Sequence, residues 1–145
     1  MKQLTDLTGL EFLQGIVDGD VPQAPMAELL SFAPIEVEFG RVVFAGEPGP
    51  EHYNPIGSVH GGIALTLLDS AMGCAVHTQL EQGVGYTTLE VKTNFVRPIT
   101  ADTGVIRCEG VVIHQGSRIA TAEGKLTDAN GKLLAHGTTT CLIFR

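Results

Sequence analysis

The chain has 145 residues, of which 43% are hydrophobic and 17% are charged, and its formal net charge is −7. This length and composition predict a single globular domain over residues 1–145, with residues 1–34 as an N-terminal helical extension. The negative charge argues against binding to nucleic acids or acidic membranes, both of which attract basic surfaces. The N-terminal segment lacks the continuous apolar core of a signal peptide, so we expect a cytoplasmic protein.

The first third of the chain contains two helical patterns and one strand pattern. Residues 3–18 repeat apolar side chains at helical spacing, and residues 26–32 predict a second, short helix that ends before Pro34. Residues 35–45 begin with alternating apolar and acidic side chains, which is typical of a strand. The proline- and glycine-rich residues 46–57 predict a loop.

A long apolar helix is the central prediction. Residues 63–80 contain no proline and a single glycine, and apolar side chains occupy nearly the whole circumference of the predicted helix. Such a helix must be wrapped by other elements, and it is too short and too often interrupted to span a membrane. One carboxylate, Asp69, stands inside the apolar run, where burying its charge is costly without compensation.

The second half of the chain changes to Thr-, Val- and aromatic-rich alternation, which predicts four consecutive strands joined by turns. The resulting fold class is α+β, with one dominant helix on a single face of an antiparallel sheet. The edges of such a sheet need cover, so we expect a homodimer. The four predicted strands are residues 86–97, 104–114, 118–127 and 132–144.

Gly61 and Gly62 follow His60 at the start of the long helix. The first amides of a helix lack internal partners and carry the positive end of its dipole. Because glycine has no Cβ, a substrate oxygen could approach these amides closely, as in an oxyanion hole. The same glycines could instead serve only to let the helix pack closely on the sheet. We expect His60 to form a structural hydrogen bond at the start of the helix, and it could also contact the substrate.

Asp69 is a candidate general base or nucleophile, and the alternative is a buried carboxylate paired with an arginine from a neighbouring strand. Eight residues separate it from Gly61, which corresponds to about 12 Å of helix at about 1.5 Å per residue. The amide of Gly61 and the carboxylate of Asp69 in one helix therefore cannot act on the same carbonyl. A second, antiparallel copy of the helix would bring the two groups together, so a shared active site must straddle a homodimer interface.

Other kinds of site find little support in the sequence. Cys74, Cys108 and Cys141 are odd in number and lie in apolar stretches, which predicts buried free thiols rather than disulfides or a zinc site. The remaining histidines lack metal-ligand spacing, and no phosphate-binding or dinucleotide glycine pattern occurs. We therefore expect neither a metal ion nor a cofactor.

Residues 54–69 read N-x-x-G-x-x-H-G-G-x-x-x-x-x-x-D, which resembles the active-site signature of hotdog-fold acyl-CoA thioesterases. The similarity is to the PaaI-like and thioesterase superfamily member 2-like group. It extends from about residue 35 to the C-terminus and includes Arg97-Pro98 and the segment G-K-L-L-A-H-G. The resemblance implies a long helix wrapped by a curved antiparallel sheet of five or six strands, in dimers that often pair into tetramers.

The resemblance also implies roles for individual residues. Asp69 would be the general base or nucleophile, and the backbone amide of Gly61 would bind the thioester oxygen. Asn54 would help to orient the substrate or the water, and Thr88 would position the water together with the carboxylate. The substrate would be an acyl-CoA, and the cations available near its nucleotide are Lys92, Arg97 and Arg118.

The expected reaction is hydrolysis of an acyl-CoA to the free acid and CoA. We expect the acyl group to lie along the helix, and a few residues of the N-terminal third to close the pocket. A hotdog-fold hydratase or dehydratase is one alternative, although no histidine pairs obviously with the carboxylate. A non-catalytic acyl-CoA-binding module is the other, and it has little use for an interior carboxylate. The residues expected along the acyl group are Leu65, Leu68 and Met72, and those expected to close the pocket are Leu29, Leu30 and Phe32.

Overall fold

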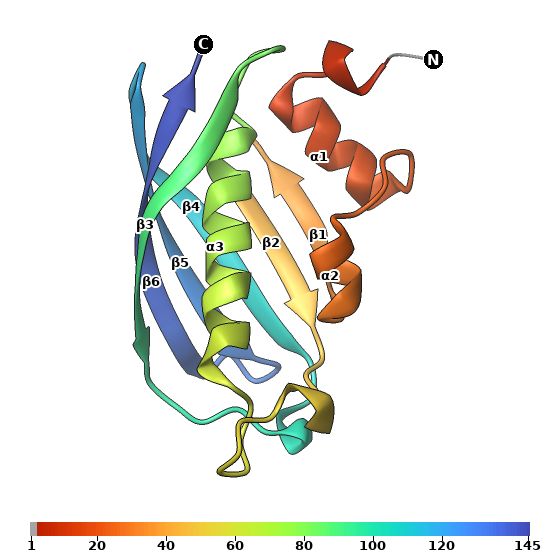
Figure 1. Cartoon of the computed structure of the whole chain (residues 1–145), viewed down its shortest axis with the longest axis vertical. Helices are drawn as coiled ribbons and strands as arrows, with labels where there is room; N and C mark the ends of the chain where they lie inside the picture. The colour runs from red at the N-terminus through yellow and green to blue at the C-terminus, as the bar shows by residue number, and fades with distance from the viewer. Residues whose placement is uncertain (1–2) are drawn as a thin grey trace.

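The computed structural model describes residues 3–145 and consists of a curved six-stranded sheet wrapped around one long helix (Figure 1). All neighbouring strands are antiparallel, in the order β1-β2-β4-β5-β6-β3. This is the predicted α+β hotdog architecture. The main elements are α1 Gly9–Asp18, α2 Pro25–Leu29, β1 Phe32–Glu38, β2 Arg41–Gly46, α3 Gly61–His77, β3 Gly85–Phe95, β4 Ile106–Gln115, β5 Ile119–Asp128 and β6 Leu133–Phe144, with short 3-10 turns at Leu4–Asp6, Pro50–His52 and Ala101–Thr103.

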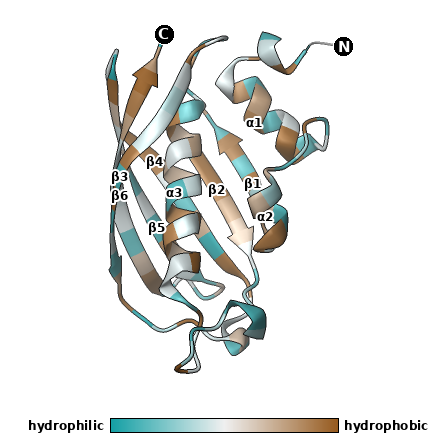
Figure 2. Cartoon of the chain, viewed as in Figure 1, coloured by the Kyte–Doolittle hydropathy of each residue, from teal (hydrophilic) through white to brown (hydrophobic). Residues whose placement is uncertain are grey.

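The core lies between α3 and the concave face of the sheet. Leu68 and Met72 of α3 are fully buried and press against Gly124 of β5. A Cβ on Gly110 of β4 would overlap the backbone of Ala71, so helix and sheet meet at a distance that only glycine permits. The strands carry alternating hydrophobic and hydrophilic bands (Figure 2), as expected when one face of a sheet is buried.

Helix α1 packs on β1 at the edge of the sheet (Figure 1). It begins with a capping box, in which the Thr8 hydroxyl accepts from the Glu11 amide and the Glu11 carboxylate accepts from the Thr8 amide. It ends at Gly19, which adopts φ +85°, a conformation that glycine tolerates best. Within residues 3–145, no helix combines the length and the apolar character needed to cross a membrane.

The prediction of one strand over residues 35–45 is wrong in one respect, because this segment forms parts of two strands joined as a hairpin. β1 and β2 are joined at Phe39 and Gly40, and Gly40 has a φ of +82°. The second predicted helix is also too long. It ends at Leu29, and Phe32 already belongs to β1, where its ring packs edge-on against Phe44 of β2.

The order of the later strands also differs from a simple chain of hairpins. β3 does not pair with β4; it crosses to the far edge of the sheet and pairs along its whole length with β6. The outer edge of β3 therefore has no strand partner within residues 3–145. This crossing places β3 alongside α3, and the side chains of the candidate site come from these two elements.

Candidate active site

The start of α3 leaves one backbone amide free. The amide of Gly62 donates to Nδ1 of His60 at 2.8 Å, and the amide of Ile63 donates to the carbonyl of His60 at 3.0 Å. Within residues 3–145 the amide of Gly61 has no acceptor. His60 is thus the side-chain cap of the helix, as its sequence position suggests, and of the two glycine amides only that of Gly61 remains available to a ligand.

Asp69 lies in the middle of α3 and is half-buried. Its Oδ1 accepts a hydrogen bond of 2.9 Å from the hydroxyl of Thr88, which projects from β3. Within residues 3–145, no arginine and no histidine pairs with this carboxylate. The alternative of a buried Asp–Arg pair is therefore not what the chain forms. Thr88 contacts the carboxylate directly, and its predicted role in positioning water stays a prediction.

The groups around Asp69 hold their protons. Burial, and to a smaller extent the negative charge of Asp69, raises the pKa of the Cys74 thiol to about 12. The pKa of Tyr86 is also raised, by burial first and then by neighbouring thiols and Asp69. Burial likewise raises the pKa of Cys141, whose strand pairs with that of Thr88. None of these neighbours supplies a second charge or a nucleophile at neutral pH.

Gly61 and Asp69 belong to the same unbroken helix, so about 12 Å of helix separates them. β3 runs antiparallel to α3 across this face: Tyr86 lies against Gly73, Thr88 bonds to Asp69, and the ring of Phe95 covers Gly61. One chain therefore presents the free amide of Gly61 at one place and the carboxylate of Asp69 at another.

Asn54 shapes the loop that leads into α3. Its Oδ1 accepts from the amides of Ile56 and Ser58 at 3.0 and 3.2 Å, and its Nδ2 donates to the Ser58 hydroxyl at 3.1 Å. This is an Asx-turn arrangement, in which the side chain substitutes for a backbone turn. It accounts for an asparagine at this position, and the predicted contact of Asn54 with substrate stays a prediction.

The three predicted CoA-contacting cations do not come together. Arg97 follows β3 and donates to the carbonyl of Leu133 at 2.6 Å. The carbonyl of Arg118 accepts from Ile143, so Arg118 lies at the opposite end of β6 from Arg97. Lys92 is exposed on β3. Only Arg97 borders the hollow beside Gly61.

The prediction that the acyl group lies against Leu68 and Met72 is wrong, because both side chains are fully buried against the sheet. Leu65 is 39% exposed and is the one residue of that predicted set open to a ligand. Phe32 is also in the core and closes no pocket, whereas Leu29 is exposed and Leu30 packs partly against the core.

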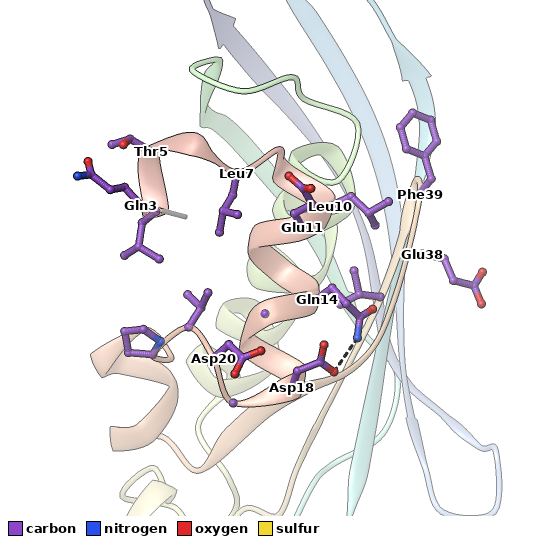
Figure 3. A pocket seen from close by; sticks show the side chains of 16 residues that line it. Gln3, Thr5, Leu7, Leu10, Glu11, Gln14, Asp18, Asp20, Glu38 and Phe39 are labelled. Atoms are coloured by element: carbon purple, nitrogen blue, oxygen red, sulfur yellow. Dashed lines mark hydrogen bonds between the residues drawn. The ribbon is translucent and has the colours of Figure 1, made fainter. Parts of the chain in front are cut away.

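Two hollows differ in their suitability for an acyl-CoA. One of about 370 Å³ lies at the start of α3 and includes Gly61 and Phe95. A larger one of about 1540 Å³ lies between the N-terminal segment and the end of β1 (Figure 3). Figure 3 shows the side chains of Asp18 and Asp20 beside this hollow, and their carboxylates would repel an anionic substrate. Only the smaller hollow adjoins candidate catalytic groups.

Sequence reasoning missed Phe95. The ring of Phe95 packs on Gly61, and its Cε1 lies 3.1 Å from the position that a Cβ on Gly61 would occupy. Phe95 is 60% exposed. The sequence around Phe95 does not predict this contact, because the two residues are far apart in the chain and meet only in the folded structure.

Comparison with known proteins identifies relatives in sequence and in fold. Residues 56–135 match the thioesterase superfamily model. Human acyl-coenzyme A thioesterase 13 is 30% identical over 110 residues, which cover 75% of this chain and 74% of that protein. A phenylacetic acid degradation-related protein of Ralstonia eutropha superposes with a TM-score of 0.81 at 27% identity, covering 90% of this chain and 98% of that one. PaaI of E. coli has the same fold, with a TM-score of 0.82 at 20% identity over 94% and 96% of the two chains.

Proposed function

The chain belongs to the thioesterase superfamily and is a thioester hydrolase; we propose that its substrate is an acyl-CoA, hydrolysed to a free carboxylic acid and CoA. The observation that carries this proposal is the half-buried carboxylate of Asp69, which Thr88 orients through a single hydrogen bond. Its second oxygen has no donor within residues 3–145 and is free to take a proton from water.

In the proposed reaction, Asp69 removes a proton from water while the resulting hydroxide adds to the thioester carbonyl. The carbonyl oxygen becomes an oxyanion, which accepts from the amide of Gly61 at the positive end of α3. The C–S bond then breaks, the thiolate takes the proton that Asp69 had accepted, and the carboxylic acid and CoA leave. A route in which Asp69 itself attacks the carbonyl, followed by hydrolysis of the mixed anhydride, uses the same groups.

We propose that two copies of the chain build each active site. The separation of Gly61 and Asp69 along α3 prevents both from reaching one carbonyl within a chain. The free edge of β3, eleven residues long, offers the surface on which a second sheet can pair. Antiparallel pairing of the two β3 strands would bring the Gly61 of one copy toward the Asp69 of the other.

The proposal is tested by measuring thiol release from a panel of aliphatic and aryl acyl-CoAs. Asp69→Asn keeps the size of the side chain and removes its basicity, so kcat should fall by about 100-fold to 10,000-fold. Asp102→Asn, an exposed carboxylate in the Ala101–Thr103 turn, is the matched control and should leave kcat unchanged.

Release of thiol by the parent protein that is lost in Asp69→Asn supports the proposal. Nearly full activity in Asp69→Asn would overturn the role of the carboxylate. A folded parent protein that binds acyl-CoAs without releasing thiol would instead indicate a binding module. Turnover of an enoyl thioester without thiol release would indicate a hydratase, a reaction for which Asp69 lacks a histidine partner within residues 3–145.

A further inference from the structure

The hollow beside Gly61 is lined mainly by apolar side chains. Val59, Ala64 and Leu134 line it together with Phe95 and Ile99, and its volume is about 370 Å³. Its titratable side chains are His60 and Arg97, both exposed, and the Nδ1 of His60 is occupied by the Gly62 amide. Most of the surface that a ligand would meet in the hollow is therefore apolar, and His60 and Arg97 are its exposed polar members.

The backbone around the hollow is already hydrogen-bonded. The amides of Val96 and Arg97 both donate to the carbonyl of Leu134, at 2.8 and 3.1 Å. The amide of Val59 donates to the carbonyl of Ile99 at 2.8 Å. A ligand with its own amides, such as the pantetheine arm of CoA, would lose hydrogen bonds to water here and find these donors occupied.

Phe95 lies between the apolar side chains of the hollow and Gly61, whose amide is free. Its ring atoms Cε1 and Cζ lie 3.1 and 3.2 Å from the position that a Cβ on Gly61 would occupy. An apolar group that filled the hollow against this ring would end next to the amide of Gly61. Its first carbonyl would then be placed at the one donor at the start of α3 that has no acceptor within residues 3–145.

We propose that this hollow is the acyl-binding pocket, that it takes an unsubstituted apolar acyl group, and that Phe95 is its specificity-determining residue. This inference rests on the proposed thioesterase function and names the substrate class. A hydroxyl on the acyl chain would meet mainly apolar side chains in exchange for water, so the pocket discriminates against hydroxylated acyl groups.

The experiment compares kcat/KM for a ladder of straight-chain substrates from acetyl-CoA to octanoyl-CoA in three variants. In Phe95→Ala the value for octanoyl-CoA should fall by about 10-fold to 100-fold while that for acetyl-CoA changes by less than about threefold, because only the longer chain loses apolar contact. Phe95→Leu should restore most of the octanoyl value. Phe144→Ala is the matched control, because the Phe144 ring packs in the same manner on Gly85, at the other end of β3. This variant should leave kcat/KM unchanged for every substrate in the series.

A second arm uses 8-hydroxyoctanoyl-CoA, which the parent protein should hydrolyse at least about 10-fold less efficiently than octanoyl-CoA. If Phe95→Ala lowered kcat/KM equally for every substrate in the series, the proposal would be overturned. Such a result would place the thiol arm, which is common to all substrates, against Phe95. Loss of the dimer in Phe95→Ala, measured by sedimentation, would overturn it as well. Absence of hydrolysis by the parent protein on every substrate is a separate result, and it would contradict the thioesterase function itself.

Discussion

Thr88 is the residue through which β3 orients the candidate base. Its hydroxyl donates to Oδ1 of Asp69 at 2.9 Å, while Asp69 receives no other hydrogen bond from a side chain within residues 3–145. Hydrogen bonds to charged groups contribute about 1.5–3 kcal/mol. Thr88→Val keeps the shape and removes the donor, so kcat should fall by about 10-fold to 100-fold.

Thr88→Ser is the matched variant, because it retains the hydroxyl, and it should recover kcat to within about threefold of the parent value. A merely structural Thr88 would give a different pattern, in which the two variants lower the melting temperature and leave kcat intact. Measuring kcat and the melting temperature on the same samples separates the two cases.

At the residue scale, the sequence predicts the groups that have local signals. Asp69 is conspicuous because a carboxylate interrupts an apolar run, and Gly61 because paired glycines precede a helix. The assignment of the free amide to Gly61 and of the capping role to His60 required the geometry of the first turn. The contact of Phe95 with Gly61 depends on tertiary packing and has no local signature.

His77 ends α3 and links it to two other elements. Its ring lies 5.5 Å from that of Phe12 in α1 and 5.4 Å from that of Tyr86 in β3. Burial lowers the pKa of His77, so the folded protein favours the neutral imidazole more than the unfolded chain does. The stability from this neutral form is present above the unfolded pKa, about 6.5, and is lost as pH falls through the lower folded value.

We therefore expect the free energy of unfolding to decrease between pH 7 and pH 5, with a contribution from His77 below the limit of about 1.4 kcal/mol per pH unit for one proton. His77→Gln should flatten this slope in urea titrations at a series of pH values. The control is His136→Gln, because His136 is exposed on β6 and should leave the slope unchanged. An identical slope in His77→Gln would show that other groups carry the acid sensitivity.

At the element scale, the sequence predicts α1, α3 and the strands β3 to β6, but it misses the division of residues 35–45 into two strands. The β1–β2 hairpin escaped prediction because Phe39 and Gly40 form a turn inside a stretch that is otherwise continuous in its strand character. The position of β3 at the far edge escaped it because strand order depends on pairing between distant segments. β3 thereby gained the contacts with α3 that orient Asp69.

At the scale of the whole molecule, the edge of β3 and the two separated half-sites lead to one prediction. Gly61→Val should block the oxyanion half-site, because its Cβ would lie only 3.1 Å from the ring of Phe95 and the branched side chain would crowd the approach to the amide. Asp69→Asn should remove the carboxylate half-site. Each variant alone should be inactive, but in a mixed dimer one of the two sites would combine an intact Gly61 from one copy with an intact Asp69 from the other.

Refolding an equal mixture of the two variants should therefore restore activity. Random pairing makes half of the dimers mixed, and half of the sites in each mixed dimer are intact, so one half times one half gives about a quarter of the parent activity. Asp69→Asn mixed with Thr88→Val is the control, because both changes fall in the same half-site and no pairing produces an intact site. Recovery in the first mixture alone would show that the active site straddles two copies. Activity no higher than that of the separate variants, in mixtures shown by sedimentation to be dimeric, would mean that each chain acts without the half-site of its partner.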